Sequence, residues 1–195
     1  MKDIYLVRHG EAADDVEGLF GGAADHEPTE KGLRDAEKFA MNFKNKEIDI
    51  VITSPYRRAK DPAKTVAKKL NVPVVEIEDL RERNHYGILT GMSHEGAAKK
   101  HPDLVEAVRK PASEIEGAEP NKDFRKRVPE AIEKIWERPE KKALVFTHLG
   151  VILAALDLHY GDLEVEHYGW VKIQKENKEW KTLESEKVIF NKQEV

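Results

Sequence analysis

The sequence predicts an α/β protein, a three-layer sandwich with helices on both faces of a mainly parallel sheet that has an antiparallel edge. Short apolar runs alternate with segments whose apolar residues recur at the 3.6-residue period of a helix. Such alternation is typical of a parallel sheet covered on both faces. Near the end of the chain, residues 165–173 and 179–190 are predicted to form a hairpin that supplies the antiparallel edge. The other expected strands are residues 4–7, 48–53, 72–77 and 143–147.

The segments between the expected strands carry helix signals. Thr29 can cap one helix, and Ser54 with Pro55 is typical of the N-cap and first position of a second. A third helix follows residue 120, and residues 151–158 form an apolar fourth. The apolar residues predicted to face the sheet are Leu33, Ala36, Ala40 and Phe43, then Ala59, Ala63, Val66, Ala67 and Leu70, and then Phe124, Val128, Ile132 and Ile135.

Two segments lack a regular pattern. Residues 10–28, rich in Gly, Ala and Asp, are predicted to be a loop, and residues 80–120 to be irregular with one short helix near 94–109. A chain of 195 residues suffices for one domain with a sizeable core. We therefore expect residues 1–195 to form a single domain, with residues 80–120 as a cap-like insertion over the sheet edge.

Composition excludes several function classes. The chain has no cysteine, which rules out disulfides and thiolate chemistry. Its net charge is −4 with basic and acidic residues interleaved, which does not favour nucleic acid or a membrane surface as partner. The first ten residues lack the apolar stretch of a signal peptide, and no run is long enough to span a bilayer. We expect a cytoplasmic protein, and the sequence leaves its oligomeric state open.

Polar residues follow four of the expected strands. Arg8 and His9 end the first strand, Arg58 lies near the start of the helix after the second, and His148 follows the fourth. If these strands are parallel, the side chains converge at the carboxyl edge of the sheet, where open α/β folds place ligands. Arginine matches phosphate oxygens bidentately, so the pattern indicates a phosphate site. Arg57 is the alternative to Arg58.

This residue set favours covalent phosphoryl transfer. A neutral imidazole of His9 would attack phosphorus, while the surrounding cations stabilise charge on the equatorial oxygens. Neighbouring positive charge lowers an imidazole pKa, which keeps His9 unprotonated near neutral pH. Glu82, after the third strand, would protonate the leaving oxygen and then deprotonate the hydrolytic water. No step needs a metal or another cofactor.

Five motifs in a fixed order resemble the histidine phosphatase superfamily, the phosphoglycerate mutase-like fold. They are Arg-His-Gly-Glu at 8–11, Thr-x-x-Gly at 29–32, Ser-Pro-x-x-Arg-Ala at 54–59, Leu-x-Glu at 80–82 and the second histidine at 148. The resemblance covers residues 4 to about 155. It implies that His9 is the nucleophile, Arg8 and Arg58 bind phosphate, His148 is the second histidine and Glu82 is the acid.

The chain also departs from the family pattern. Leu149 replaces the usual glycine after the second histidine, and Pro62 stands inside a helix, where its ring clashes with the carbonyl of Arg58. The segment 82–87 resembles the mutase Glu-Arg-His-Tyr-Gly with one residue inserted, which leaves the register of Glu82 open. Tyr86 in this segment is expected to line the substrate mouth. The longer mutase lid is not recognisable, and residues 109–111 are its nearest remnant.

One further segment resembles a mutase loop. Residues 18–25 share its Phe, Gly and Asp as Phe20, Gly22 and Asp25 but lack its Trp. This resemblance makes Gly22 a candidate for substrate binding. The remaining histidines show no shared spacing, and we expect most of them to be ordinary surface or packing residues.

The expected function is hydrolysis of a small-molecule phosphomonoester through a phosphohistidine on His9. The alternative within the same chemistry is a phosphoglycerate mutase, which would require 2,3-bisphosphoglycerate. A metal-dependent phosphoesterase would use His9, His148 and Asp14 or Asp25 as ligands, although the chain offers no compact ligand spacing. A non-catalytic phospholigand-binding module, disabled by Leu149 or Pro62, is the remaining possibility.

Overall fold

A six-stranded sheet forms the centre of the protein, as a computed structural model of residues 2–108, 115–177 and 179–191 shows. The strand order is β3-β2-β4-β1-β5-β6; the first four strands run parallel, and β5 and β6 form an antiparallel edge. The predicted fold class is confirmed. The strands are β1 Asp3–Arg8, β2 Ile50–Thr53, β3 Val74–Glu76, β4 Lys142–Thr147, β5 Leu163–Glu176 and β6 Glu179–Phe190.

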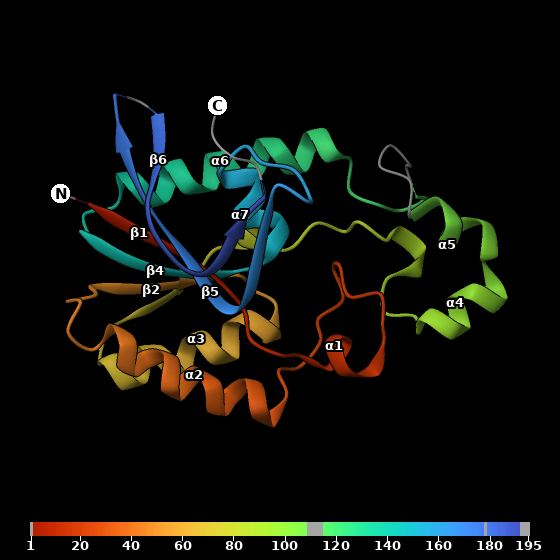
Figure 1. Ribbon diagram of the computed structural model, residues 1–195, viewed down its shortest axis with the longest axis horizontal. Coiled ribbons are helices and arrows are strands. Elements are labelled where there is room, and N and C mark those ends of the chain that lie inside the picture. The colour runs from red at the N-terminus through yellow and green to blue at the C-terminus, as the bar shows by residue number, and fades with distance from the viewer. Residues whose placement is uncertain (1, 109–114, 178, 192–195) are drawn as a thin grey trace.

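Helices cover both faces of this sheet (Figure 1). On one face, α2 (Glu30–Phe43) packs beside α3 (Arg57–Leu70). On the other face, α6 (Asn121–Glu137) packs beside α7 (Leu149–Ala155). Within the part of the chain that the structure describes, no helix has the length and apolar character needed to cross a membrane.

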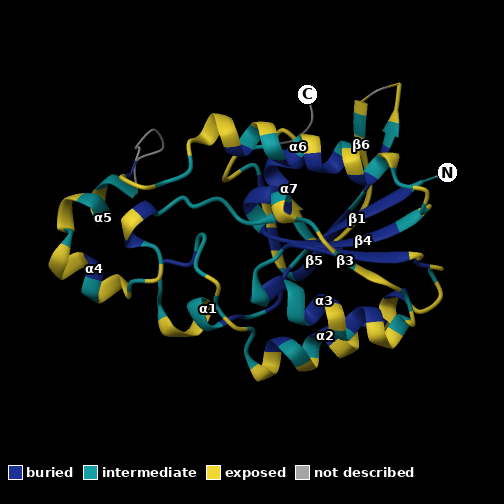
Figure 2. Ribbon diagram, turned by 180° about the vertical axis from the view of Figure 1, so that it is seen from behind, coloured by how far each residue is buried: buried dark blue, intermediate teal, exposed yellow. Residues whose placement is uncertain are grey.

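The central strands are buried on both sides, which explains why they are apolar runs without alternation (Figure 2). Successive side chains of a strand point to opposite faces. In β1, Ile4 and Leu6 join the apolar cluster under α6 and α7, whereas Tyr5 and Val7 join the cluster under α2 and α3. The sheet therefore carries two hydrophobic cores, one on each face.

The described residues of the segment 80–120, which are 80–108 and 115–120, lie at one end of the molecule (Figure 1). Two short 3-10 turns, η1 (Glu78–Leu80) and η2 (Gly87–Leu89), lead into α4 (His94–Lys100) and α5 (Pro102–Val108). The prediction of one helix over 94–109 is wrong, because Pro102 interrupts it. The residue before a proline avoids helical backbone. His101, which precedes Pro102, has φ −139° and ψ 56° and separates the two helices. Residues 109–111, the expected lid remnant, lie outside the described residues.

Two other local predictions need correction. The segment 10–28 is not all loop, because it contains the short helix α1 (Ala13–Glu17), which buries none of its residues and so leaves no apolar period. The second helix does not begin at Ser54 and Pro55. It begins at Arg57 with Tyr56 as N-cap, because the Ser54 hydroxyl contacts His148 and the Tyr56 amide instead of capping the helix.

The helix α3 continues past Pro62, which lies buried within it. The apolar helix predicted over 151–158 is α7, which begins two residues earlier, at Leu149, and ends three residues earlier, at Ala155. Both helices nevertheless begin directly after a parallel strand, which is the placement that the site requires.

The core beneath α2 gives a stability test. Phe43 is 1% exposed and packs edge-on against Tyr5 and Trp170, whereas Met41 on the same helix is 59% exposed. We expect Phe43→Ala to lower the free energy of unfolding by about 3–5 kcal/mol, because it leaves a cavity. Met41→Ala should change it by about 0.5 kcal/mol or less. Urea denaturation followed by circular dichroism measures both, and equal effects would contradict the assigned core.

Candidate active site

The pairing of β1 with β4 brings two histidines together. The strands are parallel, and Arg8 lies opposite Thr147, so that the next residues, His9 and His148, leave the sheet at the same edge. Their rings lie 5.1 Å apart between centroids, at 64°. Ser54 follows the neighbouring strand β2 at the same edge. Residues far apart in the sequence thus meet at the carboxyl ends of three parallel strands.

Hydrogen bonds show which ring nitrogen of His9 carries the proton and which has a lone pair. Its Nδ1 lies 2.7 Å from the carbonyl oxygen of Gly10, and a carbonyl can only accept, so Nδ1 carries the proton. The Nε2 lone pair then faces the Nε of Arg58, which donates to it at 3.3 Å. Burial, followed by the charges of Arg58 and Arg8, holds the pKa of His9 well below its usual range. The His9 imidazole is therefore neutral at physiological pH.

His148 presents a proton to the same space. Its Nε2 lies 2.8 Å from the Ser54 hydroxyl, which also accepts a hydrogen bond from the Tyr56 amide. In the tautomer in which this hydroxyl donates to Nε2, the other ring nitrogen, Nδ1, bears the hydrogen. This atom is buried and has no hydrogen-bond partner among the described residues. Burial first, then Arg58 and His9, keep the pKa of His148 well below its usual value.

Arg58, not Arg57, occupies the site. Arg58 is 2% exposed, and its guanidinium donates to the carbonyl oxygens of Gly22 at 2.7 Å and Ala24 at 2.5 Å. Arg57 lies on the surface, where it pairs with Glu27 and Asp61. Gly22 thus holds a phosphate-site arginine through its carbonyl.

Arg8 completes the positive charge beside His9. Its Nη1 donates to the Val165 carbonyl at 2.6 Å, and its Nε is buried without a hydrogen-bond partner in the described part of the chain. Because buried donors are almost always paired, the unpartnered Arg8 Nε and His148 Nδ1 indicate a place for an acceptor between them. A phosphate oxygen has the charge and the lone pairs that both donors need.

Glu82 reaches the cavity from the other side. Its carboxylate accepts hydrogen bonds from the backbone amides of Arg83 at 2.8 Å and Gly150 at 3.1 Å. These bonds lower its pKa, but burial outweighs them and raises the pKa overall. A carboxyl with a raised pKa can carry a proton at a pH where His9 is neutral. The inserted residue in segment 82–87 therefore does not remove Glu82 from the site.

The departures from the family pattern are accommodated locally. A side chain at position 150 would lie 2.3 Å from Glu82 Oε1, so the glycine is needed there, one residue after Leu149. Leu149 lines the cavity and packs against the core beside α7. Pro62 leaves the Arg58 side chain directed at His9. Neither residue closes the site.

The site opens into a cavity of about 450 Å³. Gly22 and Tyr86 both line it, and the Tyr86 ring packs against Phe20 and His85 with centroids 5.0 Å and 5.1 Å apart. Gly22 has a φ of +48°, and a side chain there would press against Tyr86. The cavity wall thus joins phosphate-binding groups to an aromatic rim that Tyr160 extends.

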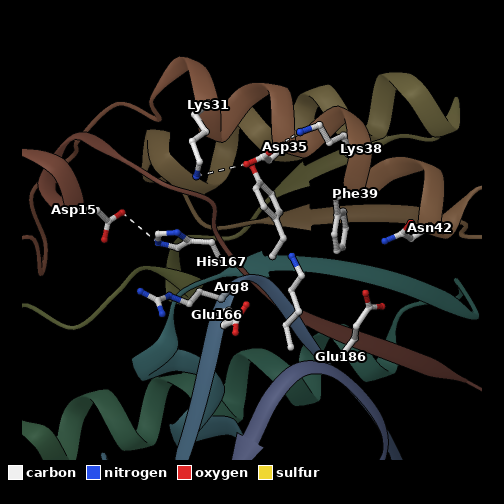
Figure 3. Close-up of a pocket in the computed structure, with 12 residues that line it drawn as sticks. Arg8, Asp15, Lys31, Asp35, Lys38, Phe39, Asn42, Glu166, His167 and Glu186 are labelled. Carbon is white, nitrogen blue, oxygen red and sulfur yellow. Dashed lines mark hydrogen bonds and ion pairs between the residues drawn. The ribbon is translucent and has the colours of Figure 1, made fainter.

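Two residues beside His9 were not expected. The ring of His167, on β5, lies 6.2 Å from that of His9, and its Nε2 lies 3.3 Å from the Asp15 carboxylate (Figure 3). Sequence alone gave one usable signal for His167, its position at the start of the predicted hairpin, whose strand would border the first one. Asp15 sits in α1, which has no sequence signature.

The proposed metal ligands do not gather around the histidines. The Asp25 carboxylate accepts the Arg57 amide at 2.6 Å, away from His9. Asp14 lines the cavity, but residues 2–108, 115–177 and 179–191 contain no group of three His, Asp or Glu side chains placed to hold a metal ion.

The fold and the paired histidines define a class of protein that binds phosphoryl groups at the carboxyl edge of an α/β sheet. Comparison with known proteins specifies the class. A model of the histidine phosphatase superfamily (branch 1) matches residues 4–190. The chain belongs to this superfamily.

Relatives of the chain include phosphatases. The uncharacterized phosphatase PhoE of Bacillus subtilis is 30% identical over 168 residues, covering 85% of this chain and 82% of PhoE. A metal-independent phosphoserine phosphatase of Arabidopsis thaliana is 32% identical over 158 residues, covering 78% of this chain and 66% of that protein. The structure of Bacillus stearothermophilus YhfR has the same fold, with a TM-score of 0.83 at 24% identity over 93% of this chain and 95% of YhfR.

Phosphoglycerate mutases match a shorter part of the chain. The 2,3-bisphosphoglycerate-dependent mutase 2 of Bacteroides thetaiotaomicron is 35% identical over 105 residues, which covers 52% of this chain and 42% of the mutase. The mutases are thus the more distant relatives, and the phosphatases match over most of the length.

The two adjacent arginines allow a matched test of the phosphate site. We expect Arg58→Met to weaken binding of inorganic phosphate about 10- to 100-fold, the loss of a hydrogen-bonded charge. Arg57→Met removes a charge one residue away and should leave the affinity unchanged. Isothermal titration calorimetry gives both dissociation constants, and circular dichroism verifies folding. Equal losses in the two variants would show that only the overall charge of the segment matters.

Proposed function

We propose that this protein hydrolyses a small-molecule phosphomonoester through a phosphohistidine on His9. One observation carries the proposal: the unprotonated Nε2 of a neutral, buried His9 accepts a hydrogen bond from Arg58, and the charge of Arg8 and the ring of His148, whose Nδ1 is unpartnered among the described residues, lie close by. This environment supplies a nucleophile and stabilises charge on the oxygens of a transferring phosphoryl group.

In the first step, Nε2 of His9 forms a bond to phosphorus as the bond from phosphorus to the leaving oxygen breaks. Arg8, Arg58 and His148 bind the equatorial oxygens. Protonated Glu82 gives its proton to the leaving oxygen, which departs as an alcohol. The proton on Nδ1 of His9 stays there and is donated to the Gly10 carbonyl in a hydrogen bond, so the phosphoimidazole carries the positive charge that favours its later cleavage.

In the second step, the Glu82 carboxylate takes a proton from water as that water attacks phosphorus. The bond between phosphorus and Nε2 breaks, and the electron pair returns to the neutral imidazole. The products are inorganic phosphate, protonated Glu82 and free His9, which restores the starting state. The cycle needs no metal and no organic cofactor, in keeping with the metal-independent relative.

The substrate's leaving group would occupy the cavity beside Glu82. We propose that the segment 80–120, to which Glu82 belongs, acts as a cap on a single domain 1–195. Tyr86 and Leu149 line this space, so an organic group fits beside the acid. The relatives' activity on phosphoserine makes phosphorylated small metabolites the first substrates to test. We place nucleic acids and membranes outside its partners.

Phosphoglycerate mutase activity is the second candidate, favoured by the matches to mutases over half of the chain. It would return the phosphoryl group from His9 to a sugar acid and would need 2,3-bisphosphoglycerate for priming. The full-length likeness to phosphatases favours water as the acceptor. Isomerisation of 3-phosphoglycerate that outpaces phosphate release would establish the mutase.

The nucleophile can be tested by trapping. With p-nitrophenyl phosphate, rapid quench at alkaline pH should capture one phosphoryl group on His9, identified by peptide mass spectrometry. His9→Ala should form none and should release no phosphate above background. His101→Ala, at the end of α4 and away from the cavity, serves as control and should match the wild type. Undiminished turnover in His9→Ala would overturn the mechanism.

The acid can be tested by pH dependence. Because the pKa of Glu82 is raised, its protonated form persists above the usual carboxyl range and is lost as pH rises. We expect kcat/KM for an alkyl phosphate to fall along this limb, and Glu82→Gln to remove the limb and lower the rate about 10²- to 10⁴-fold. With p-nitrophenyl phosphate, whose leaving group needs no proton, the loss should be far smaller. Equal losses on both substrates would contradict the acid role.

A further inference from the structure

A carboxylate and an imidazole that the proposed cycle does not use lie beside the nucleophile. His167 Nε2 is 3.3 Å from Asp15 Oδ2, and the His167 ring lies 6.2 Å from the ring of His9. Apart from this ion pair, the buried Nε2 atom has no hydrogen-bond partner among the described residues. Asp15 is fixed in turn, since its carboxylate accepts the Ala12 amide at 2.8 Å.

The backbone is distorted where it presents His167. The ladder between β5 and β6 is irregular between Val165 and Trp170, and such bulges re-aim side chains next to active sites. Tyr168, the residue after His167, has a φ of +58°, a conformation that is unfavourable for a bulky side chain. Its hydroxyl donates to the Gly32 carbonyl at 2.5 Å, which anchors the distorted segment. Strain of this kind persists at positions where function requires it.

The Asp15 carboxylate is ionised at any working pH. Burial raises its pKa, but the contacts with His167 and the Ala12 amide outweigh burial and lower it to about 2. A bare carboxylate here would repel a phosphate dianion bound at His9. Protonation of His167 neutralises the carboxylate and adds a cation to the site.

Solvent can reach this pair. His167 lines a second cavity of about 740 Å³, and Arg8 and Asp15 line both this cavity and the one at His9 (Figure 3). Proton exchange at His167 therefore does not require the active-site cavity to open. The charged and titratable groups around His167 come from five elements. They are Arg8, His9 and Glu11 from β1 and the turn after it, Asp15 from α1, Lys31, Asp35 and Lys38 from α2, Glu166 and Tyr168 from β5, and Glu186 and Lys187 from β6.

Several of these charges pair with one another. Lys31 pairs with Glu11 at 3.1 Å and with Asp35 at 3.6 Å, and Lys38 pairs with Asp35 at 2.8 Å. Asp15 contacts His167 instead. The charge that Asp15 presents to the site is therefore balanced when this imidazole carries a proton.

We propose that His167, held by Asp15, binds the phosphoryl group as a third cation beside Arg8 and Arg58 and makes anion binding depend on its proton. His167 would touch the substrate, and Asp15 would act through it as a positioning residue. The role of the anion as substrate rests on the proposed function, but the anion site itself does not.

Sulfate is the suitable probe, because its charge stays at −2 across the range of interest. We expect its affinity for the wild-type protein to fall as pH rises, because the proposed contact needs the protonated imidazole of His167. His9 and His148 do not add a charge at neutral pH, because their pKa values lie well below the usual one. Isothermal titration calorimetry at several pH values measures the effect.

Three variants separate the charge of His167 from its packing. His167→Gln should weaken sulfate binding about tenfold or more at low pH, the loss of a charged hydrogen bond, and should abolish the pH dependence. His167→Lys should retain binding and extend it to high pH. Asp15→Asn should shift the fall in affinity to lower pH, because the amide no longer stabilises the imidazolium.

The surface pair His159–Asp162, 3.8 Å apart, provides the matched control. His159→Gln removes a histidine from a similar pair outside both cavities and should leave sulfate binding and its pH profile unchanged. Thermal unfolding of every variant shows which ones fold. If His167→Gln is unstable, the profile of Asp15→Asn decides the question.

Unchanged affinity and pH dependence in His167→Gln or Asp15→Asn would overturn the inference. The outcome is separable from that for the proposed function. If phosphohistidine forms on His9 but sulfate binding ignores His167, the inference fails and the phosphatase mechanism stands. If sulfate binding follows His167 but no phosphohistidine forms, the anion site stands and the mechanism fails. In steady-state kinetics, His167→Gln should raise KM and change kcat less.

Discussion

The parallel pairing of β1 with β4 is the constraint on which the site depends. Its register aligns Arg8 with Thr147, so the residues that follow leave the sheet as neighbours. A slip of one residue would turn His9 or His148 to the opposite face. That register is itself held by the two cores, because Leu6 and Val145 face one of them and Val7 and Phe146 the other. Packing on both faces of the sheet thus places the imidazoles.

The same burial sets the chemistry of the site. Two imidazoles and two guanidinium groups share a small volume, and the structure keeps both imidazoles neutral. Among the described residues, Arg8 Nε and His148 Nδ1 have no hydrogen-bond partner, and an unpaired buried polar group costs free energy. An anion would satisfy these donors. The two apolar cores offset this cost, as is common where a functional site is less stable than its scaffold.

The sequence predicted those parts of the site that directly follow strands or begin helices, because topology alone fixes such residues. His9, Arg58 and His148 are of this kind. It named Glu82 through the Leu-x-Glu motif but left its register open, because the contact with the Gly150 amide depends on how an irregular segment folds. It placed His167 only at the start of a predicted hairpin and gave no indication of Asp15, because one lies in a strand irregularity with an unusual φ beside it and the other in a helix of five residues. Neither feature leaves an apolar period.

Gly150 shows how the departure at Leu149 can be tolerated. The requirement near the second histidine is an amide that reaches Glu82 and a residue without a side chain at that point of contact. Position 150 meets both needs, so Leu149 is free to pack against the core. Two amides stabilise the carboxylate while burial opposes its charge. Burial prevails and raises the pKa, so this carboxyl keeps its proton to a higher pH than an ordinary glutamate, as a proton donor requires.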